Sequence, residues 1–262
     1  MITERDYKYI IFKVEEGICF ITLNRPDRLN ALKFPLQMEI VDVLESIRED
    51  DSVRVVVIRG AGTSFCSGDD LKNMGSFKPL KEGFKIPHHK VMHMIREIPK
   101  PFIALLHGYC LGAGFELALA CDFRLGAEDL VIGDHRTSRA IGIFSGASWF
   151  LPRLIGFARA TEIIFTGRHL DAKEALEIGL LNRIYSVKDF NVESREFIEK
   201  IAKMPTKCLG YNKAMLNYSL GNDLFKSLQN EFKLFNENSM TNDYKEGNKS
   251  FFERRDPVFE GR

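Results

Sequence analysis

Short apolar runs alternate with segments of helical periodicity through the first part of the chain. Residues 9–14 and 18–23 are rich in β-formers and flank a glycine turn, which predicts a hairpin. Residues 53–58 and 102–106 are continuously apolar, as strands buried on both faces are. Over residues 35–47, apolar side chains recur at helical spacing behind a proline in the first turn. Strands separated by helices predict a mainly parallel α/β fold.

The remainder of the chain is predicted to become increasingly helical. Further short strands are expected at residues 123–125, 131–132 and 181–185, with helical segments between them. From residue 187 onward the periodicity is helical throughout, interrupted by short polar breaks. We therefore expect an α/β core over residues 1–186 and a helical region over residues 187–262.

The stretch from residue 101 to 122 ends an apolar strand in a glycine turn and then opens a helix. Small residues at 112–114 allow the backbone to approach a neighbouring segment closely. A strand that ends in this way directs backbone N–H groups towards one point, a geometry that binds anions. A dinucleotide-binding motif is excluded, because Leu117 occupies the position of its third glycine.

One carboxylate, that of Glu116, lies in the first turn of this predicted helix. An acidic residue there often does no more than complement the helix dipole. The neighbours of Glu116 at 117, 119 and 120 are all apolar, however. A carboxylate in such company is either paired or more readily protonated, and the second case suits proton transfer.

A second glycine loop, residues 62–74, follows the preceding apolar strand. Gly68 is expected in a turn conformation that few other residues adopt, and Asp69 then offers a backbone N–H close to a helix start near Asp70. The two aspartates also fit a simple capped helix entrance. Because α/β folds place sites at the carboxyl ends of strands, the two glycine loops together predict two N–H donors for one oxygen. Residues 75–90 mix Gly, Pro and Lys without a period, which predicts a mobile flap over the cleft.

Composition narrows the possible classes of function. The chain has 262 residues, 45% hydrophobic and 28% charged, as is ordinary for globular proteins. Lys plus Arg number 37 and Asp plus Glu number 36, a balance that argues against nucleic-acid or membrane partners. The start of the chain is charged where a signal peptide needs an apolar core, and no run has the length of a membrane span.

Cysteine and histidine spacing predicts no metal site. The five cysteines are odd in number and lack a CxxC pair, so we expect free thiols in a reducing cytoplasm. His88, His89 and His93 come nearest to metal-ligand spacing, but a solvated helix face is the favoured interpretation.

Several motifs, in order and spacing, resemble those of the enoyl-CoA hydratase/isomerase (crotonase) superfamily. They span essentially the whole chain and include NRP (24–26), NAL (30–32), FCSGDDL (65–71), HGY (107–109), LPRLIG (151–156) and FERRDPVF (252–259). The resemblance implies an α/β fold, a spiral of ββα units, followed by a helical carboxyl-terminal region that mediates trimerisation. It also implies an acyl-CoA thioester as substrate, held by its carbonyl oxygen between two backbone N–H groups, and no further cofactor.

The same resemblance assigns roles to individual residues. The two N–H groups of this oxyanion hole belong to Asp69 and Ala113, with the Asp69 side chain expected to point away. Glu116 matches one of the family's two catalytic glutamates. The residues expected to bind CoA and the acyl group are Arg28, Ala31, Gly68, Asp70, Leu71, Lys72 and Gly112.

The second glutamate of the family's hydratases is absent from this chain. Its position falls on Ser138, or on Thr137 if the loop is one residue longer, and Ser138 is therefore our second candidate catalytic residue. The following segment, residues 143–149, is also shorter than the commonest family pattern. Glu116 could perform both proton transfers in turn, or Asp134 could take part.

Three functions are compatible with these residues. The first is enoyl-CoA hydratase, in which Glu116 activates the water that adds to a trans-2-enoyl-CoA. The second is another enolate reaction on acyl-CoA, namely double-bond isomerisation or thioester hydrolysis; one carboxylate suffices for a proton shift, although family isomerases tend to keep the missing glutamate. The third, a non-catalytic RNA-binding member, is disfavoured by the near-neutral charge and the lack of a basic, aromatic-rich stretch.

The expected partner is a second copy of the same chain. The resemblance implies a homo-oligomer, a trimer or a dimer of trimers. Phe251 and Phe252 near the end of the chain stand among charges and suit packing on a neighbour. Neither nucleic acid nor a membrane is expected as a partner.

Overall fold

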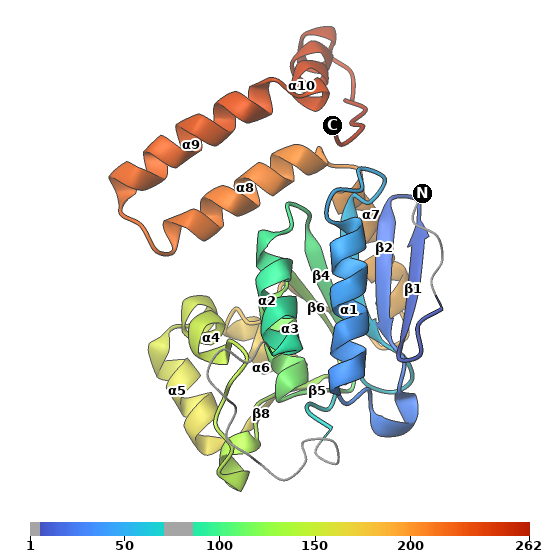
Figure 1. Cartoon of the computed structure of the whole chain (residues 1–262), viewed down its shortest axis with the longest axis vertical. Coiled ribbons are helices and arrows are strands. Elements are labelled where there is room, and N and C mark those ends of the chain that lie inside the picture. Colours follow the sequence, from blue (N-terminus) through green and yellow to red (C-terminus); the bar gives the residue numbers. More distant parts are fainter. Residues whose placement is uncertain (1–5, 71–85) are drawn as a thin grey trace.

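A six-stranded sheet forms the centre of the computed structural model, which describes residues 6–70 and 86–262 (Figure 1). The strand order is β1-β2-β3-β4-β6-β9; β1 and β2 pair antiparallel, and every following pair is parallel. The strands are β1 (Ile10–Glu15), β2 (Ile18–Leu23), β3 (Val55–Gly60), β4 (Phe102–Leu106), β6 (Phe123–Ala127) and β9 (Arg183–Tyr185). The predicted hairpin and the predicted mainly parallel α/β fold are confirmed.

Helices cover both faces of this sheet. One face packs against α1 (Phe34–Ile47), α2 (Pro87–Glu97) and α3 (Ala113–Ala120), and the other packs against α7 (Phe190–Ala202). Every residue of β2 and β4 is buried, as their continuous apolar runs predict. The helix α7, which the sequence assigned to the carboxyl-terminal region, thus packs on the core sheet.

A second, smaller sheet leads the chain into α3. Its order is β5-β7-β8, with β5 at Tyr109–Leu111, β7 at Val131–Gly133 and β8 at His169–Asp171. The strands β5 and β8 were not predicted: residues 109–111 stand directly before the glycine turn at 112–114, and β8 has a single apolar residue, Leu170, between His169 and Asp171. The other elements are η1 (Pro26–Arg28), η3 (Arg136–Arg139), α4 (Ala147–Ile155), α5 (Phe157–Thr166) and α6 (Ala172–Glu177).

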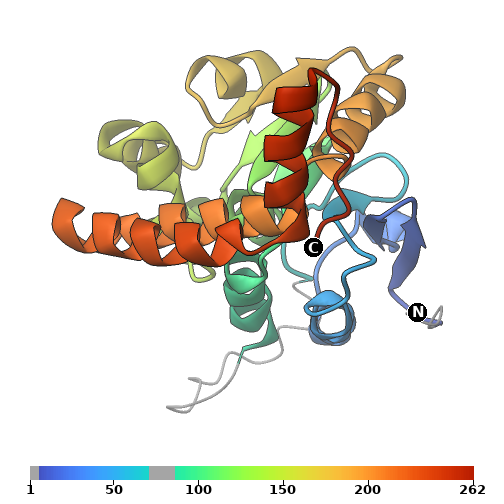
Figure 2. The ribbon, with the colours of Figure 1, turned by 90° about the horizontal axis from the view of Figure 1, so that it is seen from above.

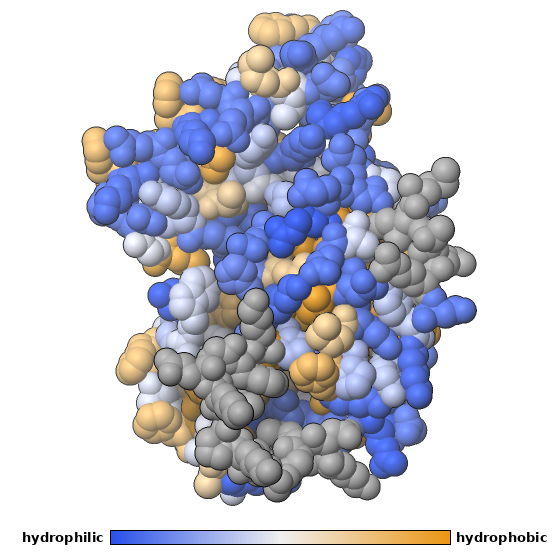
Figure 3. All heavy atoms as spheres, viewed as in Figure 1, coloured by the Kyte–Doolittle hydropathy of each residue, from blue (hydrophilic) through white to orange (hydrophobic). Residues whose placement is uncertain are grey.

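The last three helices extend away from the core (Figures 1 and 2). They are α8 (Thr206–Ser219), α9 (Leu224–Ser239) and α10 (Asn242–Glu253). Lys213 anchors α8 to the core, because its Nζ lies 2.8 Å from the carboxylate of Asp122 and binds two backbone carbonyls. Large apolar side chains of α9 and α10 remain exposed, including Phe232, Phe251 and Phe252 (Figure 3).

Two expectations for residues 75–90 have different outcomes. Residues 75–85 of the predicted flap lie outside the described residues, whereas the chain from Pro87 onward is helical, so the irregular prediction is wrong there. His89 and His93 are exposed on α2, but His88 is 2% exposed. The interpretation of all three histidines as a solvated face is therefore wrong for His88.

Other expectations from composition can be compared directly with the structure. All five cysteines are free thiols, and four of them are buried. Among the residues that the structure describes, no helix is both long and apolar enough to cross a bilayer.

Two glycines allow close backbone approaches beside α3. Gly108 has a φ of +52°, and a Cβ atom there would lie 2.0 Å from the carbonyl oxygen of Thr63. In the first turn of α3, a Cβ atom on Gly114 would lie 2.6 Å from the Cβ of Cys66. Glycine is required at such distances. The loop that carries Gly68 is thereby held against the start of α3, as the small residues predicted.

We expect Gly114→Ala to lower the free energy of unfolding by about 1–3 kcal/mol, because the added methyl group overlaps Cys66. Urea denaturation followed by circular dichroism measures this difference. Gly221→Ala is the control, since a Cβ atom there meets nothing within 4 Å and should change stability by less than about 0.5 kcal/mol. Equal effects of the two substitutions would contradict the close packing of α3 on the Cys66 segment.

Candidate active site

The two glycine turns that were predicted to supply backbone donors lie against each other. A Cβ atom on Gly68 would be 3.7 Å from the backbone nitrogen of Ala113. The N–H of Leu32 donates to the Gly68 carbonyl at 2.7 Å, and the carbonyl of Leu32 accepts from the Asp70 N–H at 2.8 Å. Since neighbouring N–H groups in an extended segment point to opposite sides, the Asp69 N–H points away from Leu32.

The second amide belongs to Ala113, the first residue of α3. Gly112 before it has a φ of +54°, a conformation that glycine adopts without strain. The N–H groups in the first turn of a helix have no acceptor within that helix. The two turns border a cavity of about 150 Å³, whose walls include Gly68, Asp69, Gly112 and Arg136. We refer to it as the small cavity.

Glu116 is completely buried and is held from two sides. Its Oε1 accepts hydrogen bonds from the backbone N–H groups of Phe144, Ser145 and Ala147, at 3.2, 2.8 and 3.4 Å. Its Oε2 lies 2.9 Å from Nη2 of Arg136. The sequence left open whether this carboxylate is paired or more readily protonated. In the structure it is paired, and the side chain is held in a single orientation.

Arg136 is a buried cation surrounded by three carboxylates. Its Nε binds both carboxylate oxygens of Asp134, at 2.9 and 3.1 Å, and its Nη1 lies 3.7 Å from Asp69. Glu116 is the third partner. Burial lowers the pKa of Arg136, but the hydrogen bonds that it donates to Asp134 and the negative charges of Glu116, Asp134 and Asp69 outweigh burial and raise that pKa. The guanidinium is therefore a permanent positive charge at the centre of the site.

Burial shifts the pKa values of two further side chains, Asp69 and His88. Burial raises the pKa of Asp69 to about 6, although Arg136 opposes this shift. The Asp69 carboxylate, which we expected to point away, thus lies near the guanidinium. Burial also lowers the pKa of His88 to about 3, so the imidazole is neutral at physiological pH. Its Nε2 is buried without a hydrogen-bond partner among the described residues, and the ring lies against the Ala113 backbone.

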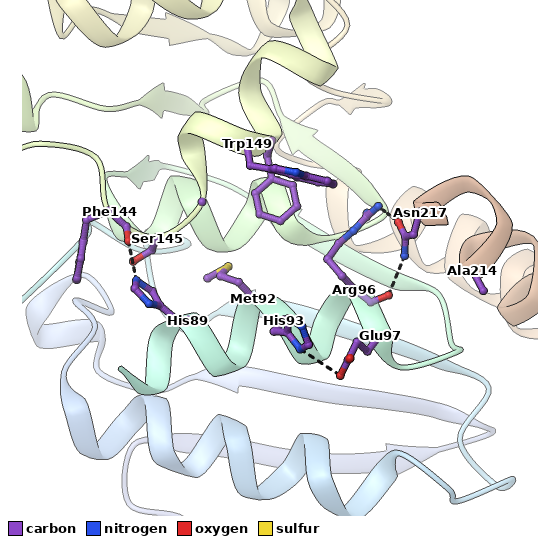
Figure 4. A pocket seen from close by; sticks show the side chains of 12 residues that line it. His89, Met92, His93, Arg96, Glu97, Phe144, Ser145, Trp149, Ala214 and Asn217 are labelled. Carbon is purple, nitrogen blue, oxygen red and sulfur yellow. Dashed lines mark hydrogen bonds and ion pairs between the residues drawn. The ribbon is translucent and has the colours of Figure 1, made fainter. Parts of the chain in front are cut away.

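A second and larger cavity lies beside the turn whose N–H groups bind the Glu116 carboxylate. It has a volume of about 630 Å³ and runs between α2, α4 and α8 (Figure 4). Phe144 and Ser145, whose amides bind Glu116, form part of its wall, together with Met92 and Trp149. Glu116 is therefore bound by a residue from the wall of each of two cavities, Arg136 at the small cavity and Ser145 at a second one whose surface is mainly apolar. We refer to the second as the large cavity.

The structure places the residues expected along the CoA at different depths. Ala31 is buried, and the Asp70 carboxylate lies 2.7 Å from Arg25, next to the Gly68 turn. Arg28 is exposed on η1. Leu71 and Lys72 lie outside the described residues.

The candidates for the missing second glutamate do not reach Glu116. Ser138 is exposed on η3 and donates its hydroxyl to the carbonyl of His135 at 2.7 Å. Thr137 is exposed as well, and its hydroxyl donates to the carbonyl of Ile164 at 2.7 Å. Asp134 is buried but is bound to Arg136. Within the described ranges, no three or more His, Cys, Asp or Glu side chains are placed to hold a metal ion.

Three residues of the site, Arg136, Ser145 and His88, were not predicted from the sequence. Arg136 stands in a polar loop together with Arg139, which is exposed, and local pattern does not distinguish the two. For Ser145 a weak signal existed, because it falls in the shortened segment 143–149. For His88 there was none, because the segment before it lacks a clear period.

We expect Arg136→Leu to lower the free energy of unfolding by about 3–5 kcal/mol, because it leaves buried carboxylates without their cation. Chemical denaturation measures the loss. Combining it with Asp134→Leu should cost less than the sum of the single substitutions, since the two residues act as a pair. The exposed neighbour supplies the control, Arg139→Leu, and a loss as large there would contradict the central role of Arg136.

Known proteins share this fold. A family model described as enoyl-CoA hydratase/isomerase matches residues 13–262. A crotonyl-CoA hydratase of Syntrophomonas wolfei is 31% identical over 97% of this chain and 98% of its own. The structure of an enoyl-CoA hydratase from Bacillus anthracis matches with a TM-score of 0.91 at 35% identity, covering 97% of this chain and all of that one. An enoyl-CoA hydratase subunit from Geobacillus kaustophilus matches with a TM-score of 0.92 at 31% identity, covering 98% of this chain and all of that one. The chain belongs to the enoyl-CoA hydratase/isomerase family, whose members act on acyl-CoA substrates.

Proposed function

We propose that this protein adds water to trans-2-enoyl-CoA thioesters, with Glu116 as the acid and base. The observation that carries the proposal is the position of the Glu116 carboxylate, buried and fixed beside two backbone turns that lie against each other. The family membership supports an acyl-CoA substrate, and the related Syntrophomonas wolfei protein is named for hydration of a short enoyl-CoA.

In this proposal the amides of Asp69 and Ala113 bind the thioester oxygen. When water attacks, its oxygen forms a bond to the β-carbon, and the electrons of the double bond move onto the thioester as an enolate. Preorganised N–H donors stabilise such an oxyanion by about 3–4 kcal/mol each in studied enzymes. CoA would extend along the residues named by the resemblance, from the Arg28 to Ala31 loop to Gly68, Asp70 and Gly112, and on to Leu71 and Lys72.

Glu116 then handles one proton twice. Its carboxylate takes a proton from the attacking water and returns that proton to the α-carbon, so that the net change is the addition of H and OH across the double bond. This assignment is supported by the positions of Ser138, whose hydroxyl binds a backbone carbonyl, and of Asp134, which is bound to Arg136. The hydrogen bonds that Glu116 accepts from the described residues come from backbone N–H groups, and none joins it to another carboxyl group.

Isomerisation of a double bond in an acyl-CoA is the second candidate. The observation that favours it is the same single carboxylate, because moving a double bond requires one group that removes a proton and returns it to another carbon. Incubation with a 3-enoyl-CoA, followed by proton NMR, distinguishes the two reactions. Isomerisation gives the 2-enoyl ester, whereas a hydratase leaves the 3-enoyl ester unchanged.

We expect Glu116→Gln to reduce the rate of crotonyl-CoA hydration by at least about 100-fold, because the amide cannot accept the proton from water. The loss of the enoyl-thioester absorbance over time measures the rate. Glu128→Gln, an exposed substitution of the same type, should keep the rate of the unchanged protein. A Glu116→Gln variant with full activity would rule out the assigned role.

We propose in addition that the chain forms a homo-oligomer, a trimer or a dimer of trimers, through α9 and α10. The support is the exposure of large apolar side chains on these helices, with Phe232 at 70% and Phe252 at 81%. Surfaces of this kind mark contacts with other proteins.

Light scattering coupled to gel filtration should therefore give three or six times the mass of the chain. Phe251→Asp combined with Phe252→Asp should shift the protein towards a smaller species, because charges replace apolar side chains at the proposed contact. Val192→Asp, an exposed position on α7, is the control. A chain that elutes as a monomer at micromolar concentration would refute the oligomer.

A further inference from the structure

The hydroxyl of Ser145 is a buried polar group that the proposed reaction has not yet used. The residue is 2% exposed, and its Oγ has no hydrogen-bond partner in the described part of the chain. A buried hydroxyl without a partner is destabilising, so its presence requires an explanation other than the stability of the fold.

Ser145 lies on the turn that holds Glu116. Its own N–H donates to Oε1 of Glu116 at 2.8 Å, and the N–H groups of Phe144 and Ala147 bind the same oxygen. The Ser145 side chain therefore starts from a backbone segment that is fixed directly against the carboxylate. Because the turn is held by three hydrogen bonds, the Cβ atom that carries the hydroxyl has a defined position relative to Glu116.

The same residue lines the large cavity (Figure 4). The neighbouring walls are formed by apolar and aromatic side chains such as Met92, Trp149 and Phe150. Ser145 thus lies in the wall of a mainly apolar cavity, at the turn that binds Glu116, with its hydroxyl buried in that wall.

Most other polar side chains on this wall already have partners. His89 binds a backbone carbonyl at 2.7 Å, His93 lies 3.1 Å from a carboxylate, and Asn217 donates to the carbonyl of Arg96 at 2.9 Å. The Nε of Arg96 also lacks a partner, but it lies beside Asn217, away from Ser145 (Figure 4). Among the described side chains that line the large cavity, Ser145 therefore has the unused hydrogen-bonding capacity nearest to Glu116.

We propose that the Ser145 hydroxyl binds the oxygen atom at the β-carbon of the acyl group, first as the attacking water and then as the hydroxyl of the product. The inference rests on the proposed hydration at Glu116. A serine hydroxyl both donates and accepts hydrogen bonds, so it can orient a water molecule while Glu116 takes a proton from it. The water oxygen forms the bond to the β-carbon, the proton goes to Glu116, and Ser145 keeps its own proton throughout.

This role differs from that of a second carboxylate. Ser145 supplies orientation but no titrating group, and Glu116 alone carries the proton between water and the α-carbon. The contact is with the oxygen of the substrate, so it should matter for ligands that carry that oxygen and not for ligands that lack it.

Two CoA esters that differ by one oxygen test the contact directly. Isothermal titration calorimetry compares 3-hydroxybutyryl-CoA with butyryl-CoA on the unchanged protein and on Ser145→Ala. We expect Ser145→Ala to weaken binding of the hydroxy ester by about 5- to 10-fold, the effect of one lost hydrogen bond, and to leave butyryl-CoA within about twofold. Ser148→Ala, which removes an exposed hydroxyl from the first turn of α4, should change neither.

Kinetics give a second readout on the same variants. The kcat for crotonyl-CoA hydration should fall about tenfold or more in Ser145→Ala with little change in KM, because orientation of water is lost while binding of the ester is kept. Removing an unbonded hydroxyl should not lower the melting temperature. If Ser145→Ala nevertheless fails to fold, Ser145→Cys gives the same comparison, since a thiol is a weak donor.

The outcomes separate this inference from the proposed function. Equal weakening of both esters by Ser145→Ala, or no weakening of either, overturns the role of Ser145 and leaves the role of Glu116 standing. If the unchanged protein binds neither ester, the proposed function itself fails, and the inference fails with it.

Discussion

The guanidinium of Arg136 is shared by three carboxylates that come from separate segments of the chain. Asp69 follows the Gly68 turn, Glu116 belongs to the first turn of α3, and Asp134 follows β7. The three acidic side chains are 14%, 0% and 2% exposed. Charges removed from water to this extent repel one another strongly unless a cation lies between them. Arg136 therefore holds the turn, the helix and the loop together where the reaction is proposed.

Backbone N–H groups fix the Glu116 carboxylate together with Arg136. Glu116 is bound by the guanidinium through one oxygen and by three N–H groups of residues 144–147 through the other. A carboxylate held from both sides keeps one orientation, which is what the transfer of a proton between two fixed positions requires. A thioester bound at the glycine turns, with its acyl group directed towards the large cavity, would pass this carboxylate.

Much of the fold could be predicted because its signals are local. Continuous apolar runs predict the strands β2 and β4, and a helical period predicts α1. Each of these patterns is contained within a short segment of the chain. The glycine turns were also predicted, from the small residues in the sequence. The structure gives the reason for those residues, since Gly112 has a positive φ and Gly114 leaves room for Cys66. The strands β5 and β8 were not predicted, because β5 continues directly into the glycine turn, β8 has no apolar run of its own, and both are defined by pairing with the distant strand β7.

By itself the sequence determined the strands of the central sheet, the two glycine turns and the presence of Glu116 in the first turn of α3. The tertiary structure decided which polar side chains surround that carboxylate. Arg136 and Arg139 share η3, yet one is buried against Glu116 and the other is exposed. Ser145 is enclosed beside a residue 29 positions earlier in the chain, while Ser138 remains at the surface. Burial of a polar side chain depends on contacts between segments far apart in sequence, and no local pattern encodes it.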